Sequence, residues 1–113
     1  MSQTPERLIE EALEHLAAVR AHLAHVPYHP DVALDAACHR LATAIDRVGQ
    51  LPPDMREAAC GGGWRDARAL RNRIVHGYRT VDPHLVLRAI EREVEPLERG
   101  LADAAESLRE ATT

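Results

Sequence analysis

The segment 71–78 gathers five polar side chains that suit chemistry on a phosphodiester: Arg71, Asn72, Arg73, His76 and Tyr78. An imidazole can accept or release a proton near pH 7. A guanidinium can hold a phosphate with two N–H groups and stabilise the charge that develops on it. A base for a ribose 2′-hydroxyl and a clamp for the phosphorus suffice for cleavage without a metal. We therefore take Arg71, Asn72 and His76 as candidate catalytic residues.

The spacing of Arg71 and His76 does not place them on one side of a helix. Residues five apart lie about 140° apart around the helix axis, whereas Asn72 and His76, four apart, share a face. The two side chains converge only if His76 leaves the helix at its end, or if a second copy of the chain completes the site. The sequence therefore gives a hint of a homodimer with a shared site.

A purely structural interpretation competes with this one. Arg71 and His76 can cap a helix and pair with acidic side chains further along the chain, and an isolated pair with this spacing is common by chance. A tyrosine after a helix often only packs its ring, and Trp64 is expected to be an anchor in the core or in an interface. Asn72, Tyr78 and Trp64 lie in the same segment as Arg71 and His76, and their presence favours the functional interpretation.

Composition and charge narrow the class of protein. The chain has 113 residues, contains no Phe and is rich in Ala, Leu, Glu and Arg, which predicts a single all-helical domain over residues 1–113. Its net charge of −4 disfavours a general nucleic-acid binder. Residues 64–80 nevertheless hold five Arg and one Asp. This local basic patch fits a small phosphate site, with Arg68, Arg73 and Arg79 as supporting contacts.

The remaining features predict a protein of a reducing compartment that binds no metal. Cys38 and Cys60 are expected to be free thiols, Cys38 in the core. The N-terminus lacks the pattern of a signal peptide, and no apolar run is long enough to span a membrane. We therefore expect a cytoplasmic protein. No ligand set at metal spacing accompanies His22 and His25, so we expect neither a metal nor a cofactor.

Hydrophobic spacing predicts four amphipathic helices in an antiparallel up-down bundle. The first is expected over residues 5–26 with Thr4 as its N-cap, and the second from an Asp31 cap to residue 49. Residues 54–63 are the least regular stretch, with a short helical turn before three glycines. The third helix begins near Trp64 and ends before Gly77. The last follows an Asp82 cap and continues to residue 108, with Pro96 either kinking or restarting it.

The stretch 64–78 resembles the signature of HepT-like proteins, a branch of the HEPN superfamily. That signature is Arg, a polar residue that is usually Asn, three further residues, His, one residue and Tyr, as in Arg71-Asn72-Arg73-Ile74-Val75-His76-Gly77-Tyr78. Leu51-Pro52 and Val81-Asp82 also fit. This chain departs from the family at two places. Relatives often carry an acidic residue where it has Gly77. Its three glycines at 61–63 also make the segment before the helix more flexible than the family resemblance leads us to expect.

The resemblance implies a dimeric four-helix bundle in which two signature segments face each other and form a ribonuclease site without metal. It implies an antitoxin partner, a minimal nucleotidyltransferase that silences the toxin by transferring AMP to the signature tyrosine, here Tyr78. A carboxylate late in the second helix is also typical, and Asp46 occupies that place.

Two other functions remain open from the sequence. The chain could be a binding module without chemistry that docks a nucleotidyltransferase and presents a substrate or nucleotide to it. It could also be a bare dimerisation bundle. The complete Arg71–His76 pair argues against the bundle, whereas only an RNA-cleavage assay separates the enzyme from the binding module.

Overall fold

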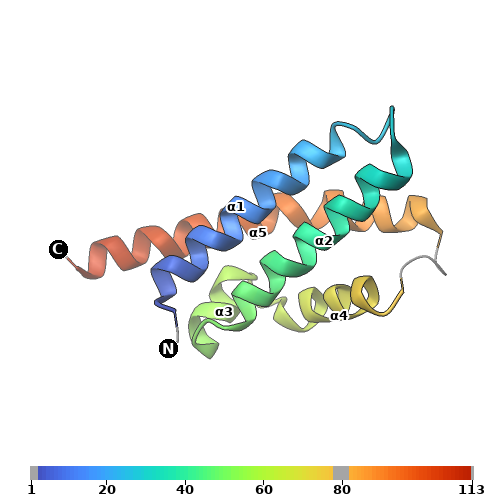
Figure 1. The fold of residues 1–113 in the computed structure, drawn as a ribbon. Coiled ribbons are helices and arrows are strands. Elements are labelled where there is room, and N and C mark those ends of the chain that lie inside the picture. Colours follow the sequence, from blue (N-terminus) through green and yellow to red (C-terminus); the bar gives the residue numbers. More distant parts are fainter. Residues whose placement is uncertain (1–2, 78–81, 113) are drawn as a thin grey trace.

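A computed structural model describes residues 3–77 and 82–112 of the chain. These residues form five helices and no strand (Figure 1). The helices are α1 (Pro5–Leu23), α2 (Pro30–Gly49), α3 (Pro53–Ala59), α4 (Trp64–Val75) and α5 (Pro83–Ala111). The all-helical prediction is confirmed. In Figure 1, α1 and α2 form an antiparallel pair, α4 lies beside α2 at an angle to it, and α5 runs behind them, with both described chain ends on the left.

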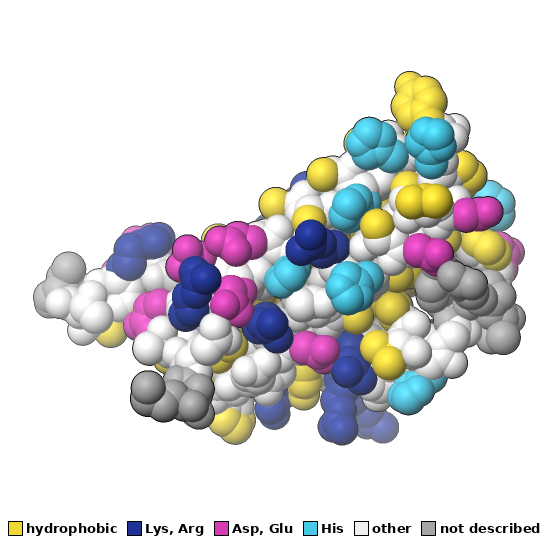
Figure 2. Space-filling model, viewed as in Figure 1, with side chains coloured by type: hydrophobic (Ala, Val, Ile, Leu, Met, Phe, Trp, Pro, Cys, Tyr) yellow, Lys and Arg dark blue, Asp and Glu magenta, His cyan; other side chains and the backbone are white. Residues whose placement is uncertain are grey.

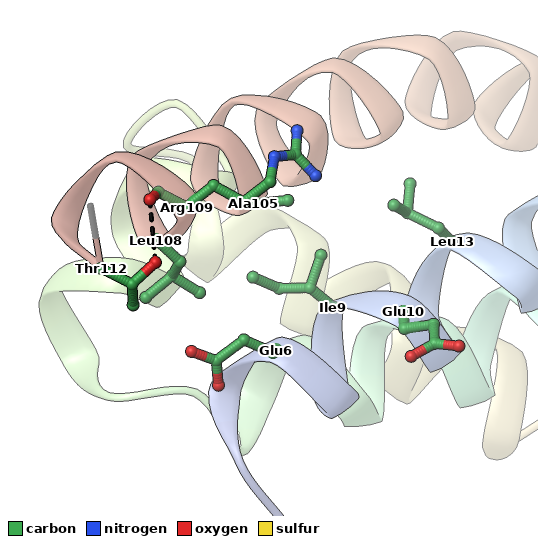
Figure 3. Close-up of a pocket in the computed structure, with 8 residues that line it drawn as sticks. All are labelled: Glu6, Ile9, Glu10, Leu13, Ala105, Leu108, Arg109 and Thr112. Atoms are coloured by element: carbon green, nitrogen blue, oxygen red, sulfur yellow. Dashed lines mark hydrogen bonds between the residues drawn. The ribbon is translucent and has the colours of Figure 1, made fainter.

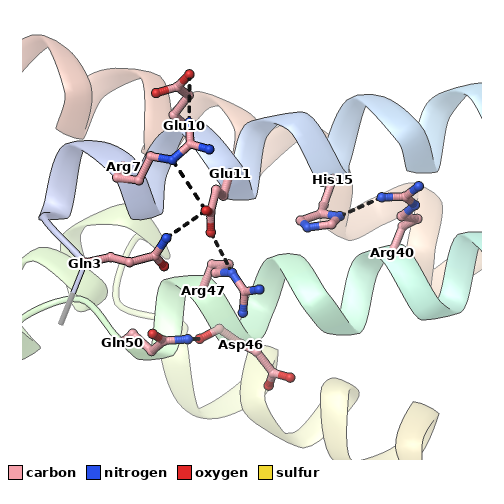
Figure 4. Close-up of polar contacts among 9 residues, drawn as sticks. All are labelled: Gln3, Arg7, Glu10, Glu11, His15, Arg40, Asp46, Arg47 and Gln50. Carbon is pink, nitrogen blue, oxygen red and sulfur yellow. Dashed lines mark hydrogen bonds and ion pairs between the residues drawn. The ribbon is translucent and has the colours of Figure 1, made fainter. Parts of the chain in front are cut away.

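The pairing of α1 with α2 is the most extensive in the molecule. Both helices carry small, fully buried residues, which allow close packing: Ala12 on α1 and Ala37 and Ala44 on α2. Polar contacts border it (Figure 4), including Arg47 Nε to Glu11 at 2.8 Å and Arg40 Nη1 to His15 Nδ1 at 3.1 Å. Burial, followed by the charge of Arg40, lowers the pKa of His15. At neutral pH its ring therefore stays uncharged and accepts the Arg40 hydrogen bond.

The helix ends differ from the prediction at two places. The first helix ends at Leu23 instead of Val26, because the N–H groups of His25 and Val26 bond three residues back and tighten the chain before Pro27. The second starts at Pro30 with His29 as N-cap, so Asp31 is not the cap. Proline suits the first helical position because its φ is already helical. The caps predicted at Thr4 and Asp82 are confirmed by hydrogen bonds from Arg7 N and His84 N.

The segment predicted to be irregular contains the helix α3, seven residues long. It ends in a turn in which Gly61 and Gly62 have φ of 57° and 83°, a conformation that favours glycine. The N–H of Gly62 bonds to the Glu57 carbonyl at 2.8 Å and closes the helix end. This turn redirects the chain from α3 into α4.

The long helix α5 continues through Pro96 without interruption, so this proline does not restart the helix. Pro96 is exposed, and the carbonyl four residues before it can therefore be solvated instead of buried without a partner. The helix supplies the core with one apolar face: Val86, Ile90, Val94, Leu97 and Leu101. Arg20 on α1 clamps it through a hydrogen bond from Nε to Glu98 at 2.9 Å.

The close approach of α3 to α5 depends on Gly100. A Cβ atom at this position would lie 1.9 Å from the Ala59 carbonyl oxygen, which is backbone and cannot rotate away. We expect Gly100→Ala to lower the free energy of unfolding by about 1–3 kcal/mol, even though alanine is the better helix former. Urea denaturation measures this loss.

Gly49→Ala is the matched comparison. Its added carbon would lie 2.9 Å from the ring edge of Trp64, a side chain that can shift, so a smaller loss is expected. A Gly100→Ala chain more stable than the wild type would show that helix propensity outweighs steric overlap at this position. It would also show that α3 does not pack against α5 as described.

An open hollow of about 430 Å³ lies between the start of α1 and the end of α5 (Figure 3). Ile9, Leu13 and Leu108 form its apolar floor, and Glu6, Glu10 and Arg109 stand around it. None of the candidate residues of segment 71–78 lines it. We therefore look for the chemistry on α4.

Candidate active site

The helix α4 is fixed at its start and along one side. Ala67 and Ile74 are buried against the rest of the core, and Leu70 is partly buried beside them. The Trp64 ring packs on Gly49, and the Arg56 guanidinium lies 5.0 Å from the ring centre, within the range of a cation–π contact. Trp64 is thus a core anchor, as predicted. The helix is held mainly through α2, which leaves much of its polar circumference open.

Arg71 and Asp46 form the central contact of the site. Arg71 Nε donates to one carboxylate oxygen of Asp46 at 2.8 Å, and Nη2 donates to the other at 3.4 Å. Asp46 points away from α1 toward α4 (Figure 4). Arg71 Nη1 donates to the side-chain oxygen of Asn72 at 3.3 Å. The guanidinium is therefore oriented by two neighbours and keeps N–H groups on both terminal nitrogens for an anion.

The structure shows the contact that Asp46 makes within the protein. The sequence placed it with the supporting contacts of the site, and its carboxylate binds the Arg71 guanidinium. The pair is partly exposed, with side-chain exposures of 31% for Arg71 and 43% for Asp46, so it adds little to stability. Its effect is on the direction of the guanidinium.

His76 ends α4 and is exposed to solvent. Its backbone N–H still donates to the Asn72 carbonyl at 3.0 Å, so the chain has not yet turned away from the helix. Gly77 follows with φ of 113°, which confirms the prediction that the residue after the helix needs a conformation favourable to glycine. In the part of the chain that the structure describes, no hydrogen bond links the side chains of His76 and Arg71.

The other predicted contacts divide into two groups. Arg68 and Arg73 are exposed on α4, and among residues 3–77 and 82–112 no carboxylate forms an ion pair with either. Tyr78 and Arg79 lie outside the described residues. Sequence reasoning did not include Arg65 among the site residues, although it shares the helix with Arg68 and is also exposed. Arg65 lies about three helical turns before His76, and this spacing is the sequence feature that places both residues on one side of the helix.

The two cysteines offer no alternative chemistry. Cys38 is 1% exposed in the core, as predicted, and Cys60 is partly buried. Burial is the main cause that raises the pKa of each thiol to about 11. Both are therefore protonated and unreactive at neutral pH. In the described ranges, no three His, Cys, Asp or Glu side chains are grouped so that they could hold a metal ion, and no helix is apolar and long enough to cross a membrane.

The structure is an all-helical domain that presents Arg71, oriented by Asp46, and an exposed His76 at the end of the same helix. The family described as "Ribonuclease HepT-like" matches residues 9–104, which include α2, α4 and the whole candidate site. The chain belongs to this HepT-like ribonuclease family. No curated protein and no solved structure matches it.

Proposed function

We propose that this chain is a metal-independent endoribonuclease, the toxin of a HEPN toxin–antitoxin system that acts on RNA in the cytoplasm. The observation that carries the proposal is the Arg71 guanidinium, which Asp46 and Asn72 hold on the helix that ends at the exposed His76. Arg71 keeps one N–H on each terminal nitrogen that a phosphate oxygen could accept.

The proposed reaction is an internal transfer at phosphorus. His76 takes the proton of the ribose 2′-hydroxyl, and the 2′-oxygen forms a bond to phosphorus while the bond to the 5′-oxygen breaks. Arg71 binds the non-bridging oxygens, whose charge grows in the transition state. The leaving 5′-oxygen takes a proton from water, which regains one from the protonated His76, and the products are a 2′,3′-cyclic phosphate and a 5′-hydroxyl. Every bond made or broken belongs to the RNA, so no metal-bound water is required.

A homodimer would bring these groups together. Arg71 and His76 lie on different sides of α4, and α4 is covered mainly by α2. Val75, between the two, is 50% exposed, although it is a large apolar side chain. A second copy placed against α2 and α4 would cover Val75 and supply the His76 that faces the Arg71 of the first copy. The proposed site is therefore composite and lies at the dimer interface.

We expect Val75→Asp to convert the dimer into a monomer, because a charge cannot be buried without a partner. Light scattering at micromolar concentration should give twice the chain mass for the wild type and a single chain mass for the variant. Ala102→Asp, at an exposed position of α5, is the control and should remain dimeric. A monomeric wild type would refute the composite site.

The regulation that we propose follows the family resemblance. A cognate minimal nucleotidyltransferase, the antitoxin, would transfer AMP from ATP to the Tyr78 oxygen and release pyrophosphate. The attached phosphate would lie close in sequence to Arg73 and Arg79 and compete with RNA for the basic segment.

The direct test is cleavage of a labelled single-stranded RNA by the purified chain in EDTA. The proposal predicts products that end in a 2′,3′-cyclic phosphate, formed at the same rate with and without the chelator. Absence of cleavage, together with binding of a nucleotidyltransferase, would instead identify a binding module.

A further inference from the structure

Four polar residues form one stripe along α4. Arg65, Arg68, Asn72 and His76 follow one another by three, four and four residues, which keeps them within about 80° of the helix circumference. All four are exposed. Successive members are about 4.5–6 Å apart along the axis, comparable to the step between phosphates on one nucleic-acid strand. We call these four residues the α4 stripe.

The arginines of the α4 stripe differ from those that the described residues pair with acids. Six described arginines form such pairs, as Arg20 does with Glu98 and Arg99 with Glu95, whereas Arg40, Arg56, Arg73, Arg88 and Arg92 form none in the described ranges. Within residues 3–77 and 82–112, no such pair involves Arg65 or Arg68. Dark-blue side chains gather over α4 at the lower edge of Figure 2.

The unpaired charges of the α4 stripe lower the stability of the helix in the isolated protein. Like charges three or four residues apart on a helix destabilise it, and the one acid of α4, Asp66, lies well round the helix from the stripe. Two neighbouring guanidiniums without an acidic partner, exposed on an acidic protein, are suited to bind an anionic polymer. Asn72 and His76 place the candidate active site at one end of the α4 stripe.

We propose that the α4 stripe is a track for the backbone of single-stranded RNA, in which Arg68 and Arg65 bind successive phosphates on one side of the scissile bond. The inference rests on the proposed function for the location of that bond at His76. Contacts to phosphates at one-nucleotide steps follow one strand and carry no sequence information. The enzyme should therefore favour unpaired RNA of any sequence that extends at least two phosphates beyond the cut.

The test measures binding, so that it does not depend on cleavage. Oligonucleotides of two to eight nucleotides, 2′-O-methylated throughout, are titrated against the full chain by fluorescence anisotropy. The wild type should gain affinity with each nucleotide up to about four and then gain little. Replacing Arg65 and Arg68 together by Ala should remove this gain, weaken hexanucleotide binding on the order of tenfold or more and reduce the salt slope by roughly 1.4.

The control removes the same charge elsewhere. Arg99 and Arg109 on α5 are exposed and paired with Glu95 and Glu106, and replacing both with Ala should leave the length dependence and the salt slope close to those of the wild type. An equal loss in this control would show that net charge, and not the stripe, governs binding, and would overturn the inference.

Two further outcomes separate this inference from the proposed function. If the wild type cleaves RNA but the Arg65→Ala, Arg68→Ala chain binds hexanucleotides as tightly, the track is refuted and the ribonuclease stands. If binding depends on the stripe but no cleavage occurs, the track stands and the ribonuclease is refuted. A change in oligomeric mass without loss of RNA affinity would make the stripe a protein interface and also overturn the inference.

Discussion

Replacing His76 with Ala is expected to slow RNA cleavage by about 10²–10⁴-fold, the contribution of a positioned general base. The fold should survive, because His76 is exposed at the end of α4 and only its backbone N–H bonds to the helix. Single-turnover rates on a labelled RNA measure the effect, and thermal unfolding establishes that the variant is folded. His22→Ala, on α1, is the control for loss of an imidazole and should cleave like the wild type.

Arginine variants complete this prediction. Arg71→Ala should lose more activity than Arg71→Lys, which keeps a charge but cannot form two parallel hydrogen bonds to phosphate. Asp46→Asn should lie between Arg71→Lys and the wild type, because the guanidinium keeps its charge but loses the partner that orients it. Undiminished cleavage by His76→Ala, or complete loss of wild-type activity in EDTA, would contradict the mechanism.

The second large effect is expected at Tyr78, which lies outside the described residues. Tyr78→Phe keeps the ring and removes only the oxygen that would accept AMP. We expect this variant to remain an active ribonuclease and to escape neutralisation when it is produced together with the nucleotidyltransferase. The wild-type chain should gain the mass of one AMP in the same cells, and the variant should gain none.

Intact-mass spectrometry after co-production gives this result directly. Tyr28→Phe is the matched control, since Tyr28 is 76% exposed, is distant in sequence from the candidate site and is the only other tyrosine. It should be modified and silenced like the wild type. An AMP-sized increase that persists in Tyr78→Phe would place the modification on another residue.

Most of the fold was predictable because it depends on local signals. Apolar residues at helical spacing, the caps at Thr4 and Asp82 and the glycine at 77 each act within a few neighbours, and all three features appear as expected. The errors also have local causes. The α1 helix ends before Val26 because the chain tightens ahead of Pro27. The helix α3 was predicted only as a short turn, because seven residues bounded by prolines and glycines are too few to show a helical period of apolar residues.

The contacts within the candidate site could not be predicted from the sequence. The sequence identified Arg71 and Asp46, which are 25 positions apart, but not that they bond to each other, because this depends on how α4 lies across α2. The same packing decides which side of α4 stays open. Arg65 joins the candidate residues only as a proposal, because its spacing from His76 extends over about three helical turns and lies outside the eight-residue signature.

The central claim is that two chains share one ribonuclease site, and subunit exchange between two inactive variants tests it most directly. Arg71→Ala and His76→Ala chains are mixed, unfolded and refolded together, and their cleavage rate is compared with that of each variant alone. If Arg71 of one chain works with His76 of the other, each mixed dimer regains one complete site, and activity should recover to about a quarter of the wild-type rate. A mixture that forms mixed dimers but stays as inactive as its components would contradict the account.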